Sequence, residues 1–144
     1  MSLPLWFIFN FGVTFLVTGF AMWKGGRPEQ GAGLFILLAT IVTFLLPDRR
    51  WSDVQFGIMW LDIFSFAVLL TLALLADRWW PMFAAGVQGL SVLLHLAFWA
   101  QMKVTSYVYM TGLNIIGHML LLTLLVGTVS HVLRQQRSRR AAPA

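Results

Sequence analysis

The sequence predicts an all-α integral membrane protein, built as a bundle of five transmembrane helices. Of its 144 residues, 59% are hydrophobic and only 10% are charged, and the mean hydropathy is +0.80. A soluble domain carries about 25% charged residues. The apolar residues fall into five runs that charged residues, glycine and proline separate. Most runs approach the roughly 20 apolar residues that a helix needs to cross a bilayer.

The breaks between the runs place the five expected helices at residues 5–23, 32–46, 56–76, 80–100 and 106–133. The first ends at the sequence KGGRPEQG, where glycine and proline indicate a loop. The second ends before Pro47, and the third ends at the charged residue Asp77. Pro81 suits the first turn of the fourth helix, because its missing N–H has no helical partner there. The fifth is long enough to tilt or to project past the membrane surface.

The run at 32–46 is the shortest, because 15 residues extend only about 22 Å at 1.5 Å per residue. An alternative fold therefore has four spans plus a re-entrant segment at 32–46. Cytoplasmic loops of membrane proteins carry an excess of Lys and Arg. Five spans with the C-terminus inside place seven such residues inside and three outside, whereas four spans give five on each side. The charges favour five spans, with a periplasmic N-terminus and a cytoplasmic C-terminus.

The predicted domain organisation is one transmembrane helical domain at 1–133 and a basic, flexible cytoplasmic tail at 134–144. The tail's basic residues are expected to be topology anchors, namely Arg134, Arg137, Arg139 and Arg140. Contact with anionic lipid or nucleic acid is the alternative, and we expect no nucleic-acid partner. Tryptophans near the predicted membrane edges indicate interface anchors in contact with the lipid bilayer, at Trp23, Trp51, Trp79, Trp80 and Trp99.

Four polar residues from four predicted helices fall at a similar depth, roughly 7–12 Å below the outer surface at 1.5 Å per residue. They are Asn10, Asp62, His95 and Asn114. Because polar groups in hydrocarbon are costly, each needs a partner. The favoured interpretation is a polar layer that fixes helix pairing, with Asp62 bonded to His95 or to an asparagine. The alternative is a proton or ion site centred on Asp62.

Two histidines raise the possibility of haem or pigment binding. His95 and His118 lie on neighbouring predicted helices, and histidine ligates haem iron. His118 lies about 10 Å deeper than His95 in the predicted helices, which argues against a shared iron. A single histidine binding a chlorophyll-type magnesium is a weaker possibility. We expect no metal and no cofactor.

Several kinds of chemistry find no support in the sequence. The chain has no cysteine, which excludes thiolate metal sites and cysteine nucleophiles. It contains no Walker loop, no HExxH, no GxSxG and no paired carboxylates within the predicted spans. We therefore expect a protein that is not an enzyme.

Several short motifs resemble a pattern in small, uncharacterised polytopic inner membrane proteins of alphaproteobacteria. The motifs are GIMWLD at Gly57–Asp62, DRWWP at Asp77–Pro81, AAGVQ at Ala84–Gln88, HLA at His95–Ala97 and KGGRPE at Lys24–Glu29. The match as a whole covers about half of the chain, and the basic tail is not part of the pattern. The resemblance implies a bacterial inner membrane setting and carries no activity.

These observations favour a small non-enzymatic membrane subunit that packs against and stabilises a larger membrane protein complex, for example an energy-transducing or photosynthetic one. The alternative is a small transporter or proton-linked channel centred on Asp62 and His95. The third possibility is haem or pigment binding through His95 or His118.

Overall fold

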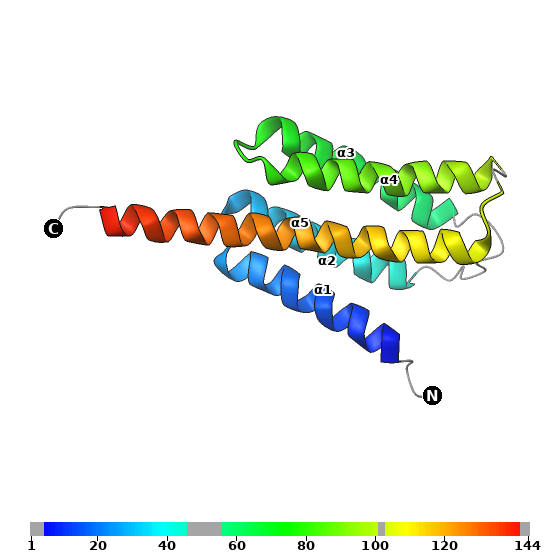
Figure 1. Cartoon of the computed structure of the whole chain (residues 1–144), viewed down its shortest axis with the longest axis horizontal. Coiled ribbons are helices and arrows are strands. Elements are labelled where there is room, and N and C mark those ends of the chain that lie inside the picture. The colour runs from blue at the N-terminus through cyan, green and yellow to red at the C-terminus, as the bar shows by residue number, and fades with distance from the viewer. Residues whose placement is uncertain (1–4, 46–55, 101–102, 142–144) are drawn as a thin grey trace.

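The chain folds into five α-helices (Figure 1). The computed structural model describes residues 5–45, 56–100 and 103–141. The helices are α1 Leu5–Lys24, α2 Arg27–Leu45, α3 Phe56–Leu75, α4 Trp80–Trp99 and α5 Ser106–Ala141. Helices α2 to α5 are long and apolar enough to cross a membrane, and α1 has 20 residues, like α3 and α4. The predicted all-α bundle of five helices is confirmed, and the chain is a multi-pass membrane protein.

Helix α5 connects two antiparallel hairpins. The first hairpin is α1–α2 and the second is α3–α4, and α5 packs against α4 on one side and α1 on the other (Figure 1). Helix α1 tilts away from α5 toward its N-terminus. The turns of both hairpins and the C-terminus lie at the same end of the bundle, which we call the inner end.

Helix α2 begins earlier than the sequence predicted. It starts at Arg27 rather than residue 32, so its 19 residues extend about 28 Å, close to the roughly 30 Å of a bilayer core. Pro28 lies in the first turn, where proline is tolerated. The turn needs glycine at position 25, because an added Cβ would lie 2.4 Å from the carbonyl oxygen of Ala21. The four-span alternative, which rested on a short segment at 32–46, thus loses its basis.

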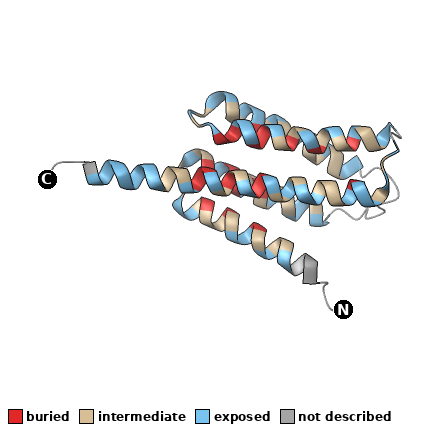
Figure 2. Cartoon of the chain, viewed as in Figure 1, coloured by how far each residue is buried: buried red, intermediate tan, exposed pale blue. Residues whose placement is uncertain are grey.

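Helix α5 continues further than predicted. It has 36 residues and ends at Ala141, so residues 134–141 are helical and not a flexible tail. The physical reason is composition, because Arg, Gln and Ala are good helix formers and no glycine or proline occurs between Leu133 and Ala141. The extension projects beyond the other helices, and its arginines are exposed (Figures 1 and 2).

The apolar core lies where α5 meets both hairpins (Figure 2). Its buried members are Ala21, Ala32, Ile36, Leu69, Trp80, Ala84, Ala85, Leu120, Leu121 and Leu124. Trp80 is wholly buried, so its prediction as an interface anchor is wrong. It turns inward because Gly127 leaves room for its ring on α5 and Glu29 accepts a hydrogen bond from its indole.

The other predicted tryptophan anchors differ from Trp80. Trp23, Trp79 and Trp99 are exposed, at 75%, 47% and 61%. Exposure is what contact with the membrane interface requires, and their role as anchors stays a prediction. Trp51 lies outside the described residues.

Candidate functional site

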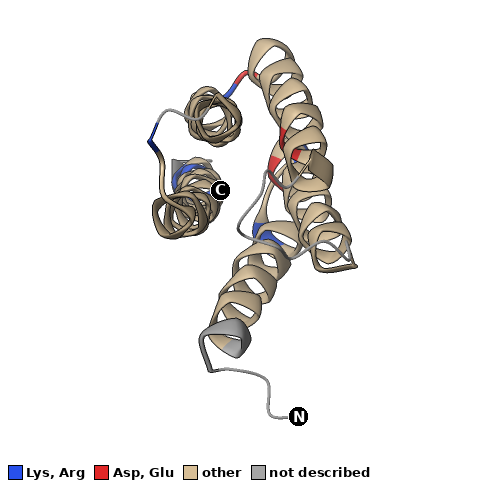
Figure 3. Cartoon of the chain, turned by 90° about the vertical axis from the view of Figure 1, so that its right-hand side faces the viewer, with Lys and Arg blue, Asp and Glu red and all other residues tan. Residues whose placement is uncertain are grey.

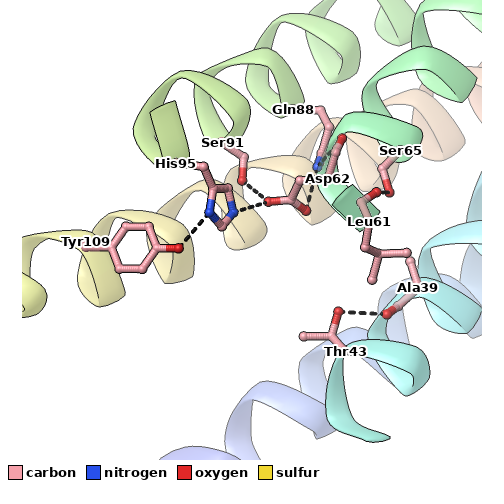
Figure 4. A network of polar contacts seen from close by, with 9 residues as sticks. All are labelled: Ala39, Thr43, Leu61, Asp62, Ser65, Gln88, Ser91, His95 and Tyr109. Atoms are coloured by element: carbon pink, nitrogen blue, oxygen red, sulfur yellow. Dashed lines mark hydrogen bonds and ion pairs between the residues drawn. The ribbon is translucent and has the colours of Figure 1, made fainter. Parts of the chain in front are cut away.

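A hydrogen-bonded cluster around Asp62 joins α3, α4 and α5 (Figure 4). Gln88 Nε2 donates to Asp62 Oδ1 at 2.9 Å, and Ser91 Oγ donates to Asp62 Oδ2. His95 Nε2 lies 3.1 Å from the same Oδ2. We call these residues, together with Tyr109, the Asp62 network. Three donors from α4 therefore satisfy one carboxylate of α3 inside the bundle.

Helical spacing brings the three donors to one carboxylate. Gln88, Ser91 and His95 follow one another at i, i+3 and i+7, which places them on one face of α4. All three are buried. Ser65 lies one turn from Asp62 on α3, but its hydroxyl donates to the carbonyl of Leu61 at 2.8 Å and does not reach the carboxylate (Figure 4).

His95 connects the carboxylate to a tyrosine of α5. Its Nδ1 lies 2.6 Å from Tyr109 Oη, and both residues are 0% exposed. The ring of Tyr109 stacks on Phe98 with 4.2 Å between centroids. Since the carboxylate accepts from Nε2–H, a neutral His95 accepts the Tyr109 hydroxyl proton at Nδ1. A protonated His95 donates at both nitrogens, so the network can take up a proton without losing a hydrogen bond.

The two ends of the network differ in exposure. The side chain of Asp62 is 19% exposed, whereas that of His95 is 0% exposed. The carboxylate is therefore the partly exposed end of the network, and the imidazole and phenol are buried behind it.

The sequence predicted part of this site. The expected pairing of Asp62 with His95 is present. The wider layer is wrong, because Asn114 lies on an exposed face of α5 and Asn10 lies on α1, which packs against α2 and α5 but not against the described residues of α3 or α4. Tyr109 was missed, although it is one of only two tyrosines and faces His95 from the next helix.

The histidines differ in their freedom to bind a metal. Both ring nitrogens of His95 are engaged, by Asp62 and Tyr109, which contradicts its weak candidacy as a haem or pigment ligand. Nδ1 of His118 lies 2.8 Å from the carbonyl oxygen of Asn114, which can only accept, so Nδ1 carries the hydrogen and Nε2 has none when the ring is neutral. Among the described residues, no three His, Cys, Asp or Glu side chains form a group that could hold a metal ion.

A second polar cluster lies at the inner end of the bundle. Glu29 of α2 is 0% exposed, and its Oε1 accepts a hydrogen bond from Trp80 Nε1 at 2.8 Å. Its Oε2 has no partner among the described residues. Nearby, Arg78 Nη2 lies 3.2 Å from His131 Nδ1. We call Glu29, Arg78, Trp80 and His131 the Glu29 cluster.

Sequence reasoning missed this buried glutamate, because residues 24–31 were interpreted as a loop. A usable signal was present, since proline followed by an acidic residue is typical of the first turn of a helix. Glu29 occupies that first turn in the structure.

The apolar core separates the two clusters. On α4, Ala84 and Ala85 lie between Trp80 and Gln88, and on α5 the buried leucines 120, 121 and 124 lie between Tyr109 and His131. An end-on view shows how few charged residues the helices carry (Figure 3). The structure therefore has two separate polar sites, one toward each end of the bundle, with apolar side chains between them.

Comparison with known proteins adds no family. The chain matches no family model, no curated protein and no solved structure. Its function is therefore argued from the geometry of these residues.

Proposed function

We propose that the protein is a small, non-enzymatic membrane subunit that packs against and stabilises a larger membrane protein complex. The observation that carries the proposal is the exposed amide of Asn114 on α5. It lies about 12 Å along the helix from Ser106, well inside the hydrocarbon layer. Its side chain makes no hydrogen bond within the described part of the chain.

A side-chain amide without a hydrogen-bond partner is energetically unfavourable inside the hydrocarbon layer. The carboxamide offers two N–H donors and a carbonyl acceptor, and a polar group without a partner in hydrocarbon costs several kcal/mol. Within the described part of the chain, no other helix brings a hydrogen-bond partner to the side chain of Asn114. The partner that would satisfy it is therefore a polar side chain from another membrane protein.

The surroundings of Asn114 fit a second helix. Gly117 lies about one turn further along α5, and a Cβ added there would meet nothing within 4 Å. His118 presents an Nε2 that makes no hydrogen bond among the described residues. Small residues let membrane helices approach closely, and polar side chains then bond across the interface. The Asn114 amide and the His118 imidazole can each engage such a helix.

The test is gentle detergent extraction at the native expression level, followed by native gel separation and mass spectrometry. We expect a large band with stoichiometric partners. Asn114→Leu should weaken that association about 3- to 18-fold, the equivalent of 0.6 to 1.7 kcal/mol for interhelical hydrogen bonds. Leu93→Ala, at a 60% exposed position of α4, serves as the control. A small band without partners, or a band that contains only copies of this chain, would contradict the proposal.

The proposed location is the inner membrane of a bacterium, with the N-terminus in the periplasm and the C-terminus in the cytoplasm. The distribution of basic residues supports it. Lys24, Arg27, Arg78 and the arginines of the α5 extension all lie at the inner end, and only three basic residues lie elsewhere in the chain. Compartment-specific reporters fused to each terminus test this orientation.

A second candidate function is a small proton-linked transporter or channel. The observation that favours it is the series from the partly exposed Asp62 through His95 to Tyr109, because its members can pass a proton along existing hydrogen bonds. The apolar core closes the route to the inner end, so transport would require the helices to move.

Proton flux in reconstituted vesicles under a pH gradient tests this candidate. Asp62→Asn should abolish the flux. Ser65→Ala should not, since that hydroxyl does not reach the carboxylate. Equal flux in vesicles with and without the protein would exclude this function.

A further inference from the structure

We propose that Glu29 is a proton-binding site at the inner end of the bundle and that His131 exchanges its proton with the inner surface. The inference is independent of the proposed function, because it concerns groups on the opposite side of the apolar core from the Asp62 network and uses no residue of the Asn114 face.

The first argument is the orphaned oxygen of Glu29. The residue is 0% exposed, and among the described residues only its Oε1 has a hydrogen-bond partner, the indole N–H of Trp80. A buried carboxylate is costly when one of its oxygens lacks a hydrogen-bond partner, because burial removes its charge from bulk water. A proton on Oε2 removes that charge and leaves Oε1 as the carbonyl oxygen that accepts from Trp80. The proton is thus the ligand that this site lacks.

The second argument is the position of His131. A Cβ added to Gly26 would lie 2.9 Å from Glu29 Oε2 and 3.3 Å from His131 Nδ1, so both side chains lie against the same glycine. Arg78 is always protonated and donates to Nδ1. Nδ1 therefore carries no hydrogen, and it lies against the same glycine as Oε2. His131 and Arg78 are half-buried, which connects the site to the inner surface.

The exchange step balances as a single proton transfer. The O–H bond at Glu29 Oε2 breaks, and an N–H bond forms at His131 Nδ1, which gives a carboxylate and an imidazolium. Arg78 loses its acceptor at Nδ1 and is free to turn toward the new carboxylate. The proton then leaves from the half-buried ring of His131 to water at the inner surface.

The charged residues at this end of the bundle come from all the elements that meet there. They are Lys24 at the end of α1, Arg27 on α2, Asp77 and Arg78 in the α3–α4 turn, and Arg134 on α5. The apolar core blocks exchange with the Asp62 network, so the proton comes from the inner side.

The test uses the fact that Glu29 is the only glutamate in the chain. Cell-free synthesis introduces glutamate labelled with ¹³C at the side-chain carboxyl carbon, and the protein is then placed in lipid nanodiscs. NMR detects one reporter signal in the unaltered protein. We expect the signal to titrate reversibly between its acid and carboxylate positions over the physiological pH range. A signal that keeps one position at every pH would overturn the proton-binding site.

The role of His131 has its own readout. His131→Gln should slow exchange of the Glu29 proton by about 100-fold, the usual contribution of a positioned acid–base group. Tyr107→Phe, at a 73% exposed position of the same helix away from the cluster, should leave the exchange rate unchanged. Equal exchange rates in His131→Gln and the unaltered protein would overturn the assignment of His131. Neither outcome bears on whether the chain binds a larger complex.

Discussion

Replacing Gly127 by alanine tests the packing of Trp80 directly. A Cβ at position 127 would lie 2.5 Å from Cγ and 2.6 Å from Cδ1 of the Trp80 ring. Carbon atoms in favourable contact lie about 3.5–4.0 Å apart, so the ring would have to retreat by about 1 Å. It has little room to do so, because Trp80 is wholly buried and its indole N–H is held by Glu29.

The expected change follows from three contributions. Overpacking a core costs about 1–3 kcal/mol, and weakening the bond from Trp80 to Glu29 adds about 1 kcal/mol. Alanine stabilises a helix by up to about 1 kcal/mol relative to glycine, which offsets part of this loss. Gly127→Ala should therefore lower the free energy of unfolding by about 1–3 kcal/mol.

Gly117→Ala is the matched control on the same helix. A Cβ there meets nothing within 4 Å, so this change should raise the free energy of unfolding by up to about 1 kcal/mol. Unfolding in detergent micelles, followed by far-UV circular dichroism, compares the two variants. If Gly127→Ala proves as stable as Gly117→Ala, Trp80 does not pack as described.

Three further predictions concern other parts of the bundle. Tyr109→Phe removes the hydroxyl that faces His95 and should lower the free energy of unfolding by about 1 kcal/mol. Tyr107→Phe, at a 73% exposed position, should leave the free energy of unfolding unchanged. Denaturant unfolding of both variants tests the difference. Deletion of residues 135–144 should reduce the helical circular dichroism signal while moving the unfolding free energy by less than about 0.5 kcal/mol, because the side chains at 135–140 are exposed. A large loss of stability would show that the extension packs on the bundle. A water-soluble quencher should reduce the fluorescence of a variant that retains only Trp79 and leave one that retains only Trp80 nearly unchanged, and equal quenching would contradict the burial of Trp80.

Hydrophobic runs and breakers were sufficient to predict the five helices. Asp62 and His95 could also be paired from the sequence, because an acid and a histidine at similar depth on neighbouring spans have few other partners in hydrocarbon. The spacing of Gln88, Ser91 and His95 is by itself sufficient to place them on one helical face. These features depend on local sequence and on the cost of polar groups in lipid.

The errors have a common physical cause, which is that tertiary contacts decided them. Pro28 marks a helix start as readily as a break, and Glu29 after it is a weak local sign of a start, so the packing of α2 against α1 decides between the two. Trp80 satisfies the usual signs of an interface anchor, but Gly127 and Glu29 provide a buried site for its ring and its N–H. Asn114 matched the depth of Asp62, yet the rotation of α5 turns it outward.

The central claim is that another membrane protein covers the Asn114 face of α5. Site-specific photo-cross-linking in the native membrane tests it most directly, with the reactive group placed at position 114 and, in a separate sample, at the exposed control position 93 of α4. The account predicts a discrete adduct with a different membrane protein from position 114 and none from position 93. Adducts with lipid alone, or only with a second copy of this chain, would contradict it.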